Sequence, residues 1–235
     1  MSMDFDHLVV MVRDKLDAHA SRLQGDGFGL TDVSVHNLGS INRLVTLESS
    51  YIELLGWPAG RPPARKEIAD QPLGLDALVF RPRNAADTHE RLRLAGFEVN
   101  PVQRLERPVA GPSGTGMAQF DTLRFARQPV PGLRIYYCQH LTPEYIWNAS
   151  ALRHANGAQS LSEIVVKAND ARSVASTLAE LAEGRVQTLN DGSHVLELPN
   201  LRLAVVPDGC VEAACISHAL LRYRDGSERP FQFAL

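Results

Sequence analysis

A unit of one strand, one helix and three further strands occurs more than once along this chain of 235 residues. The first copy opens with FDHLVVMV (5–12), a stretch rich in β-branched residues, and the amphipathic helix KLDAHASRLQ (15–24) follows it. Asp14 stands where a helix N-cap is expected. Three strand candidates come next, FGLTDV (28–33), NRLVTLE (42–48) and YIELLG (51–56). The first copy therefore predicts the order β-α-β-β-β.

The same order returns twice. The second copy begins with LDALVFRP (75–82), has Asn84 at the cap position, and continues through a helix into the strands AQFDTLRFA (118–126) and LRIYYCQH (133–140). The third begins with LSEIVVKA (161–168), has Asp170 as its cap, and contains three further strand candidates, RVQTLND (185–191), HVLELP (194–199) and LRLAVVP (201–207). Because copies of this length and number do not suit a solenoid, they predict a modular α+β protein.

These repeats set the expected domain organisation. Residues 1–157 would form a paired unit from the copies 4–57 and 74–141 with a bridging segment, and residues 158–235 would hold the third copy with C-terminal strands. The segment 107–119, rich in Gly and Pro, is expected to be a long loop, either a lid over a site or a wide hairpin. Two copies make one unit, so the third must pair across a dimer or with the C-terminal tail.

Two of the apolar strands each carry one ionisable residue. Side chains alternate across a strand, so His7 is expected to share a face with Phe5, and Glu53 to share a face with Tyr51. A carboxylate among apolar neighbours is costly when it is dry and unpaired. Three explanations stay open: a hydrogen-bonded His–Glu pair, a strand edge where Glu53 reaches water, or a divalent metal bound by both side chains.

Charge and composition exclude several classes of partner. A net charge of −3 gives no electrostatic reason to expect nucleic acid or an anionic membrane as a partner. Apolar runs are far shorter than a membrane span, and no secretory signal is visible at the N-terminus. The scattered cysteines, Cys138, Cys210 and Cys215, fit a reducing compartment. The sequence therefore predicts a cytoplasmic protein.

The repeated modules, with a histidine on a first strand and a glutamate on a last strand, resemble the vicinal oxygen chelate superfamily, which includes glyoxalase I, extradiol dioxygenases and bleomycin-resistance proteins. More narrowly, HNLGSINRLVTLESSYIELLG (36–56) and YYCQHLTPEYIW (136–147), followed by HANGA (154–158), resemble bacterial glyoxalase-like domain proteins. The similarity covers roughly residues 4–207. It implies that the modules form cupped mixed β-sheets with the helices packed outside, and that the first and last strands of each module direct ligands inward.

Carried over residue by residue, the resemblance places His7 and Glu53 at the two metal-ligand positions of the first copy. The second copy departs from the pattern, because Ala77 and Tyr136 stand at its corresponding positions. A third ligand is expected from His140, with His36 as the alternative. The implied cofactor is a divalent ion such as zinc, manganese, iron or nickel, and no organic cofactor is expected.

Further residues are expected at the cup. Tyr136 and His36 are candidate catalytic groups, since a phenol or imidazole can transfer a proton. Substrate contacts are expected from Asn42, Arg43, Tyr51 and Trp57.

Two hypotheses about function follow. The first is a metal-assisted enzyme, an isomerase, lyase or dioxygenase, acting on a small oxygen-rich substrate chelated in the cup. The second is a metal-free protein of the bleomycin-resistance type that binds and sequesters a small molecule. A homodimer is expected in either case.

Overall fold

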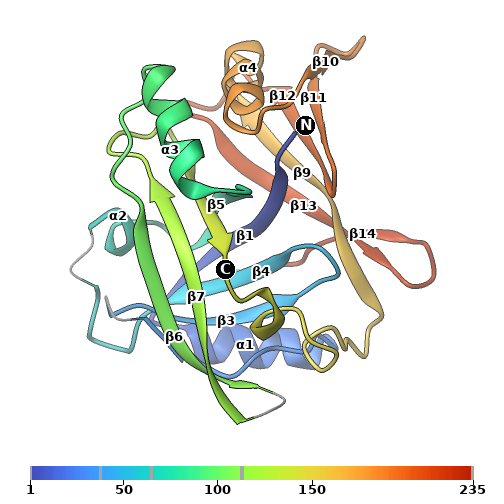
Figure 1. Cartoon of the computed structure of the whole chain (residues 1–235). Coiled ribbons are helices and arrows are strands. Elements are labelled where there is room, and N and C mark those ends of the chain that lie inside the picture. The colour runs from blue at the N-terminus through green and yellow to red at the C-terminus, as the bar shows by residue number, and fades with distance from the viewer. Residues whose placement is uncertain (1, 37–38, 64–65, 112–113, 234–235) are drawn as a thin grey trace.

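Two β-sheets and three longer helices make up most of the protein (Figure 1). This computed structural model describes residues 2–36, 39–63, 66–111 and 114–233. The helical segments are α1 (Leu16–Gly25), α2 (Lys66–Ala69), α3 (Ala85–Leu94), α4 (Ala171–Leu181) and the short 3-10 helix η1 (Pro143–Tyr145). Among the described residues, no helix has both the length and the apolar character that a membrane crossing requires.

The larger sheet has eight strands in the order β2-β3-β4-β1-β5-β8-β7-β6. Its strands are β1 (Asp4–Arg13), β2 (Ser34–Val35), β3 (Ile41–Thr46), β4 (Tyr51–Gly56), β5 (Gly74–Arg81), β6 (Gln103–Gly111), β7 (Gly114–Arg124) and β8 (Arg134–His140). The smaller sheet has six strands in the order β10-β11-β12-β9-β13-β14. Its strands are β9 (Ala158–Ala168), β10 (Val186–Thr188), β11 (His194–Leu198), β12 (Leu201–Pro207), β13 (Cys215–Tyr223) and β14 (Glu228–Pro230).

Strand pairing confirms the α+β class and the repeated modules. In the first module β1 runs parallel to β4, with Val9 opposite Glu53, and in the second β5 runs parallel to β8, with Val79 opposite Tyr136. The two modules join where β1 pairs antiparallel with β5. Glu53 and Tyr136 therefore occupy equivalent places in the two halves of one continuous sheet.

The third module completes its sheet with the C-terminal tail. Strand β9 runs parallel to β12, as β1 does to β4, and its other edge pairs antiparallel with β13. Strand β13 thus takes the place that β5 has in the larger sheet. The third copy thus pairs with the C-terminal tail of the same chain, which is one of the two arrangements predicted for it.

A shared hydrophobic core lies between the two sheets. Leu8 and Leu78 of the larger sheet belong to the same fully buried cluster as Ile164 and Leu203 of the smaller one. Hydrogen bonds also connect the two sheets. The Asn200 side chain, from the turn before β12, accepts from the Phe5 N–H at 2.9 Å and donates to the Phe5 carbonyl at 2.8 Å. In Figure 1 the orange to red strands and α4 accordingly lie beside the start of β1. The opposite face of the larger sheet is left to form a cup.

Three local expectations are corrected. Asp14 is not a helix cap, because α1 has Lys15 at its N-cap and no side-chain cap hydrogen bond, whereas Asn84 and Asp170 cap α3 and α4 as predicted. Residues 28–33 form no strand, and the short β2 follows them instead. Of the two forms expected for residues 107–119, the structure shows the hairpin, in which β6 and β7 pair over a long ladder. This hairpin forms one wall of the cup.

The alternation of β1 is broken near its start. The β1–β5 register shifts between Phe5 and His7, so that Asp6 is the extra residue of a bulge. Phe5 consequently packs in the core between the sheets with Leu8, and not on the face of His7 as strict alternation predicts. The bulge decides which side chains reach the cup.

Replacing Asn84 by Ala is expected to lower the free energy of unfolding by about 1 kcal/mol, because the Asn84 side chain accepts from the backbone N–H groups of Ala86 and Asp87 at the start of α3. Asp14→Ala is the matched control and should change stability by less than about 0.5 kcal/mol. Urea unfolding measures both. Equal losses in the two variants would contradict the assignment of the caps.

Candidate active site

His7 and Glu53 face the same cavity. Parallel pairing of β1 with β4 brings the two side chains together, and the separation between His7 Nε2 and Glu53 Oε2 is 3.5 Å. Both residues are almost inaccessible to solvent, at 3% and 6% exposure. They line a cavity of about 700 Å³, its open mouth included, and residues of the β6–β7 hairpin form another part of its lining.

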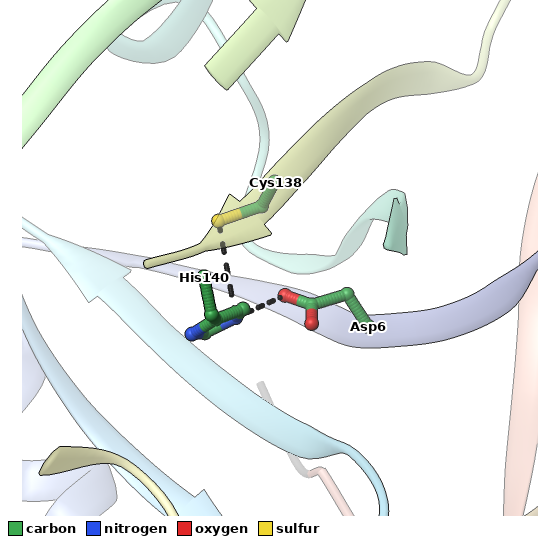
Figure 2. Close-up of side chains that lie close together, drawn as sticks. All are labelled: Asp6, Cys138 and His140. Atoms are coloured by element: carbon green, nitrogen blue, oxygen red, sulfur yellow. Dashed lines mark hydrogen bonds and ion pairs between the residues drawn. The ribbon is translucent and has the colours of Figure 1, made fainter. Parts of the chain in front are cut away.

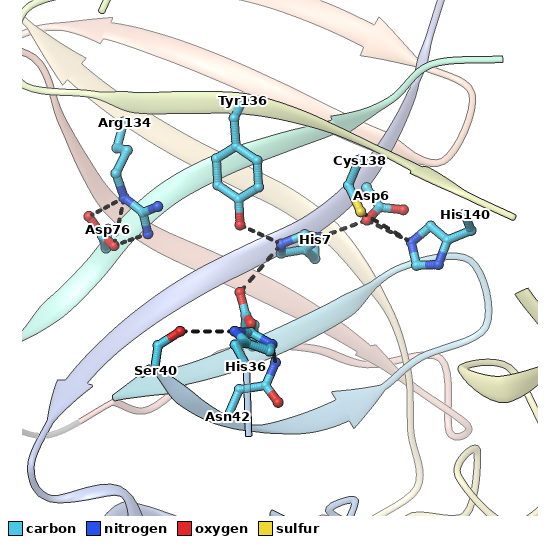
Figure 3. Close-up of polar contacts among 11 residues, drawn as sticks. Asp6, His7, His36, Ser40, Asn42, Asp76, Arg134, Tyr136, Cys138 and His140 are labelled. Atoms are coloured by element: carbon cyan, nitrogen blue, oxygen red, sulfur yellow. Dashed lines mark hydrogen bonds and ion pairs between the residues drawn. The ribbon is translucent and has the colours of Figure 1, made fainter. Parts of the chain in front are cut away.

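A chain of polar contacts extends from Glu53 to the rim of the cup (Figure 3). Asn42 on β3 donates from Nδ2 to Glu53 Oε1 at 2.6 Å, and the same nitrogen lies 3.3 Å from His36 Nε2. His36 Nδ1 in turn contacts the Ser40 hydroxyl at 2.9 Å. Asn42 Oδ1 is buried and has no hydrogen-bond partner among the described residues. The network therefore leaves one buried amide oxygen unpaired among the described residues.

The charges of the pair follow from its surroundings. Burial alone would raise the pKa of Glu53, but the hydrogen bond and the charge of His7 outweigh it and bring that pKa to about 2. Burial alone would lower the pKa of His7, but its hydrogen bonds with Asp6 and Glu53 raise it above the ordinary value. Without a bound ion, each of the two side chains thus favours the charged form of the other inside the cup.

Asp6 holds His7 from behind. Its Oδ2 contacts His7 Nδ1 at 2.7 Å and His140 Nε2 at 3.0 Å, while its Oδ1 accepts from Arg81 Nε at 2.6 Å. Burial opposes ionisation, but the charge and hydrogen bond of His140, together with the bond to His7, keep the pKa of Asp6 well below its ordinary value. With its Nδ1 engaged by a carboxylate, His7 presents Nε2 to the cavity, as metal-binding histidines commonly do.

Two tyrosines border the histidine. The Tyr136 hydroxyl lies 2.9 Å from His7 Nε2. Tyr136 stands at the position of the second copy that corresponds to Glu53 in the first, so it contacts the expected histidine ligand directly. Burial raises the pKa of Tyr136 well above its usual range, and the phenol is therefore neutral. Tyr51 stacks on the His7 ring with 4.3 Å between centroids and 15° between planes. These contacts fix the orientation of the imidazole.

Six of the predicted site residues line the cavity, namely His7, His36, Asn42, Tyr51, Glu53 and Tyr136. Three others do not. Arg43 points away from the cup and donates to the Thr31 carbonyl at 2.6 Å, because it alternates with Asn42 along β3. Trp57 follows the end of β4, beside the guanidinium of Arg13. His140 lies behind His7, on the far side of the Asp6 carboxylate.

His140 belongs to a separate cluster with Asp6 and Cys138 (Figure 2). The potential ligand atoms of these three residues lie within 4.8 Å of one another, and in the described part of the chain only this set of three meets that limit. The Asp6 oxygens are already engaged by Arg81 and two imidazoles, and burial raises the pKa of Cys138 well above its usual range. The geometry therefore suits a hydrogen-bonded support for His7. It does not bring His140 into one close set with His7 and Glu53.

Sequence reasoning missed Asp6 and Arg107. Alternation assigned Asp6 to the opposite face of β1, and only the bulge turns it toward the histidines. Arg107 lies in a segment expected to be a loop, yet it lines the cavity from β6. A signal was present, because Leu105, Arg107 and Val109 alternate as an apolar face with one charged member, the same pattern that singled out Glu53.

The donor set fits a divalent ion. Two ligands bonded at about 2.0–2.2 Å in tetrahedral geometry lie roughly 3.4 Å apart, close to the 3.5 Å between His7 Nε2 and Glu53 Oε2. Both side chains are buried and are oriented by further hydrogen bonds. His7 is held by its contact with the Asp6 carboxylate, and Glu53 accepts from Asn42. The second module supplies a phenol at its equivalent place, so the fit rests on two donors, His7 Nε2 and Glu53 Oε2.

Comparison with known proteins now places the chain. The sequence matches the family model described as a glyoxalase-like domain over residues 5–182. The chain belongs to the glyoxalase-like domain family. The match covers both modules of the larger sheet and continues through α4 of the third. No curated protein matches the sequence.

Solved structures support the same fold. A hypothetical protein from Staphylococcus aureus superposes with a TM-score of 0.72 at 14% identity, covering 98% of this chain and 99% of that one. A mutant 4-hydroxymandelate synthase from Streptomyces coelicolor gives 0.57 at 14% identity, with 93% and 70% of the two chains covered. A Mn(II)-bound glyoxalase from Novosphingobium aromaticivorans gives 0.53 at 15% identity, with 94% and 65% covered. The fold is that of the vicinal oxygen chelate superfamily.

The stability contributed by Glu53 is expected to depend on pH. Because folding lowers its pKa from 4.5 to about 2, the contribution is fully present above pH 4.5 and is lost as pH falls toward 2. Between pH 4.5 and pH 2, the free energy of unfolding of the wild type should therefore fall relative to that of Glu53→Gln by an amount of the order of 3 kcal/mol. Urea unfolding with a chelator present, kept below pH 6.5 so that His7 stays charged, measures the difference. A difference that is independent of pH would contradict the paired carboxylate.

Proposed function

We propose that this protein is a metal-assisted enzyme that acts on a small oxygen-rich molecule in the cup. The single observation that supports this most is the pair formed by His7 Nε2 and Glu53 Oε2, buried, 3.5 Å apart and facing one cavity. The relation in fold to a Mn(II)-bound glyoxalase supports a divalent ion as the cofactor. Its identity among zinc, manganese, iron and nickel is part of what experiment must decide.

His7 and Glu53 would hold the ion, which when bound would act as a Lewis acid on two neighbouring oxygens of the substrate. Asp6 would keep His7 in the tautomer that presents Nε2, since its carboxylate accepts from Nδ1. The neutral Tyr136 phenol is placed to donate a hydrogen bond or a proton to a substrate oxygen beside His7. Asn42, through its unpartnered Oδ1, would accept from a substrate hydroxyl.

Isomerisation, C–C cleavage and oxygen-dependent cleavage all require charge to be stabilised on adjacent oxygens, so each of the three is compatible with the proposed site. His36 joins the site through Asn42 and not through His7, which suits a role in proton relay at the rim. Tyr51, stacked on His7, would form part of the floor on which the substrate rests.

A metal-free binding protein of the bleomycin-resistance type is the second candidate. The observation that favours it is the contact of Tyr136 with His7 Nε2, because this hydroxyl engages the nitrogen that a metal ion would use. In that case the cup would retain its shape and lose its cofactor. Ala77, fully buried at the other equivalent position, offers no metal donor.

Metal content is expected to be close to one equivalent per chain in protein purified without chelator and supplied with zinc, manganese, iron or nickel. His7→Ala and Glu53→Gln should each reduce it by more than tenfold, since removing one of two protein ligands leaves an ion weakly held. His218→Ala, an exposed histidine on β13, is the matched control and should bind as the wild type does. Elemental analysis after gel filtration measures all four proteins.

The second candidate makes the opposite prediction. A thermal-shift screen of small aromatic compounds would then raise the melting temperature to the same extent with and without a chelator. Substoichiometric metal in the wild type, together with chelator-independent ligand binding, would reject the enzyme hypothesis in favour of sequestration.

A further inference from the structure

Arg107 carries a guanidinium into the wall of the cup. It lies on β6, is only 6% exposed, and lines the same cavity as His7 and Glu53. Among the described residues its side chain donates to the Ser34 Oγ and lies 5.9 Å from the centre of the Phe120 ring. Among the residues that the structure describes, no carboxylate oxygen comes within 4.0 Å of its nitrogens.

Two neighbouring buried or half-buried arginines each have a carboxylate partner. Arg134, also on the cavity wall, is bound to the Asp76 carboxylate, with Nε 3.0 Å from Oδ2. Arg81, behind the site, is bound to Asp6. Arg124 donates to the Gln103 side chain at 2.7 Å. A buried cation is costly unless an anion accompanies it, and Arg107 lacks the carboxylate that Arg134 and Arg81 have.

The carboxylate that faces the cavity does not fill this role. Glu53 is engaged by His7 and by Asn42, and it acts on Arg107 only through a longer-range charge interaction. Burial lowers the pKa of Arg107, which is the direction expected for a cation deprived of water without a close counter-ion. An arginine still stays protonated at neutral pH, so its charge remains available to a ligand.

Arg107 lines two hollows of the cup. A smaller hollow of about 240 Å³ shares Arg107, Leu105 and Phe120 with the main cavity, and Glu106, which accepts from Gln119, also lines it. Away from this end, the wall includes the apolar side chains of Leu55 and Ile68. A guanidinium recognises planar carboxylates and phosphates through two parallel hydrogen bonds.

We propose that Arg107 is the anion-binding residue of the cup, and that the ligand is a small organic anion, a carboxylate or a phosphate monoester on an apolar body. The inference rests on the proposed function for the identity of the cavity as the ligand site, but it requires neither a metal ion nor the His7–Glu53 pair. It applies equally to an enzyme and to a sequestering protein.

The test compares anions with a neutral compound of the same shape. Benzoate, phenylacetate and phenyl phosphate are titrated by calorimetry against the wild type, Arg107→Gln, Arg107→Lys and Arg104→Gln, with benzamide as the uncharged probe. Arg104, half-exposed on the same strand and paired with Asp121, is the matched control. Metal content is measured in the same samples, and circular dichroism verifies that each variant is folded.

At least one anion is expected to bind the wild type at millimolar concentrations or tighter, and benzamide at least tenfold more weakly. Arg107→Gln should weaken binding of that anion by about 10- to 100-fold, the loss expected for hydrogen bonds to a charged group. Arg107→Lys should retain part of the affinity, and Arg104→Gln all of it. The dissociation constants of the two carboxylates and of phenyl phosphate then show which kind of anion the site prefers.

Failure of the inference and failure of the proposed function give different results. The inference is overturned when none of the anions binds the wild type, when benzamide binds as well as they do, or when Arg107→Gln and Arg107→Lys both bind them unchanged. If Arg107→Gln does not fold, the Arg107→Lys titration decides. If the wild type contains substoichiometric metal but still binds an anion in a way that depends on Arg107, the metal-assisted enzyme is rejected and the anion site is retained.

Discussion

Asp6 is a carboxylate with no access to solvent, and the geometry of the cup depends on how its charge is satisfied. One oxygen accepts from Arg81, which also donates to the Ser49 carbonyl and so ties β5 to the turn before β4. The other oxygen contacts both His7 and His140. An ionised group in this position is tolerable only because all of these partners are present together. The orientation of His7 therefore depends on contacts that come from both modules of the larger sheet.

Duplication of the module gives the cup its shape, but the two halves have different chemistry. Asp6, His7 and Glu53 in the first half correspond to Asp76, Ala77 and Tyr136 in the second. The second half thus replaces an ionisable pair with a small apolar side chain and a neutral phenol. Its aspartate is bound to Arg134, whose charge it neutralises. A symmetric fold in this way presents an asymmetric site, with the His7–Glu53 pair on one side and the neutral Tyr136 phenol on the other.

Much of the fold could be predicted from the sequence, because it is encoded in local patterns. Alternating apolar residues located most strands, and Asn84 and Asp170 marked two helix starts through their side-chain caps. Asp14 has the same residue chemistry and the same spacing, yet the chain turns one residue later there and its side chain makes no cap. Local chemistry thus located the helices and could not fix the geometry at which each one begins.

The sequence by itself determined the three modules and the presence of one ionisable residue, His7 or Glu53, in each of two apolar strands. The family resemblance, together with alternation within single strands, added Asn42, Tyr51 and Tyr136 as candidates. Only the tertiary structure decided that Asp6 turns toward the histidines, that β13 completes the third module, and that Arg107 enters the cup without a counter-ion. The physical reason is that alternation records which face a residue takes within its own strand. Bulges, sheet partners and ion pairs arise from contacts between distant segments, such as the 75 residues that separate Asp6 from Arg81.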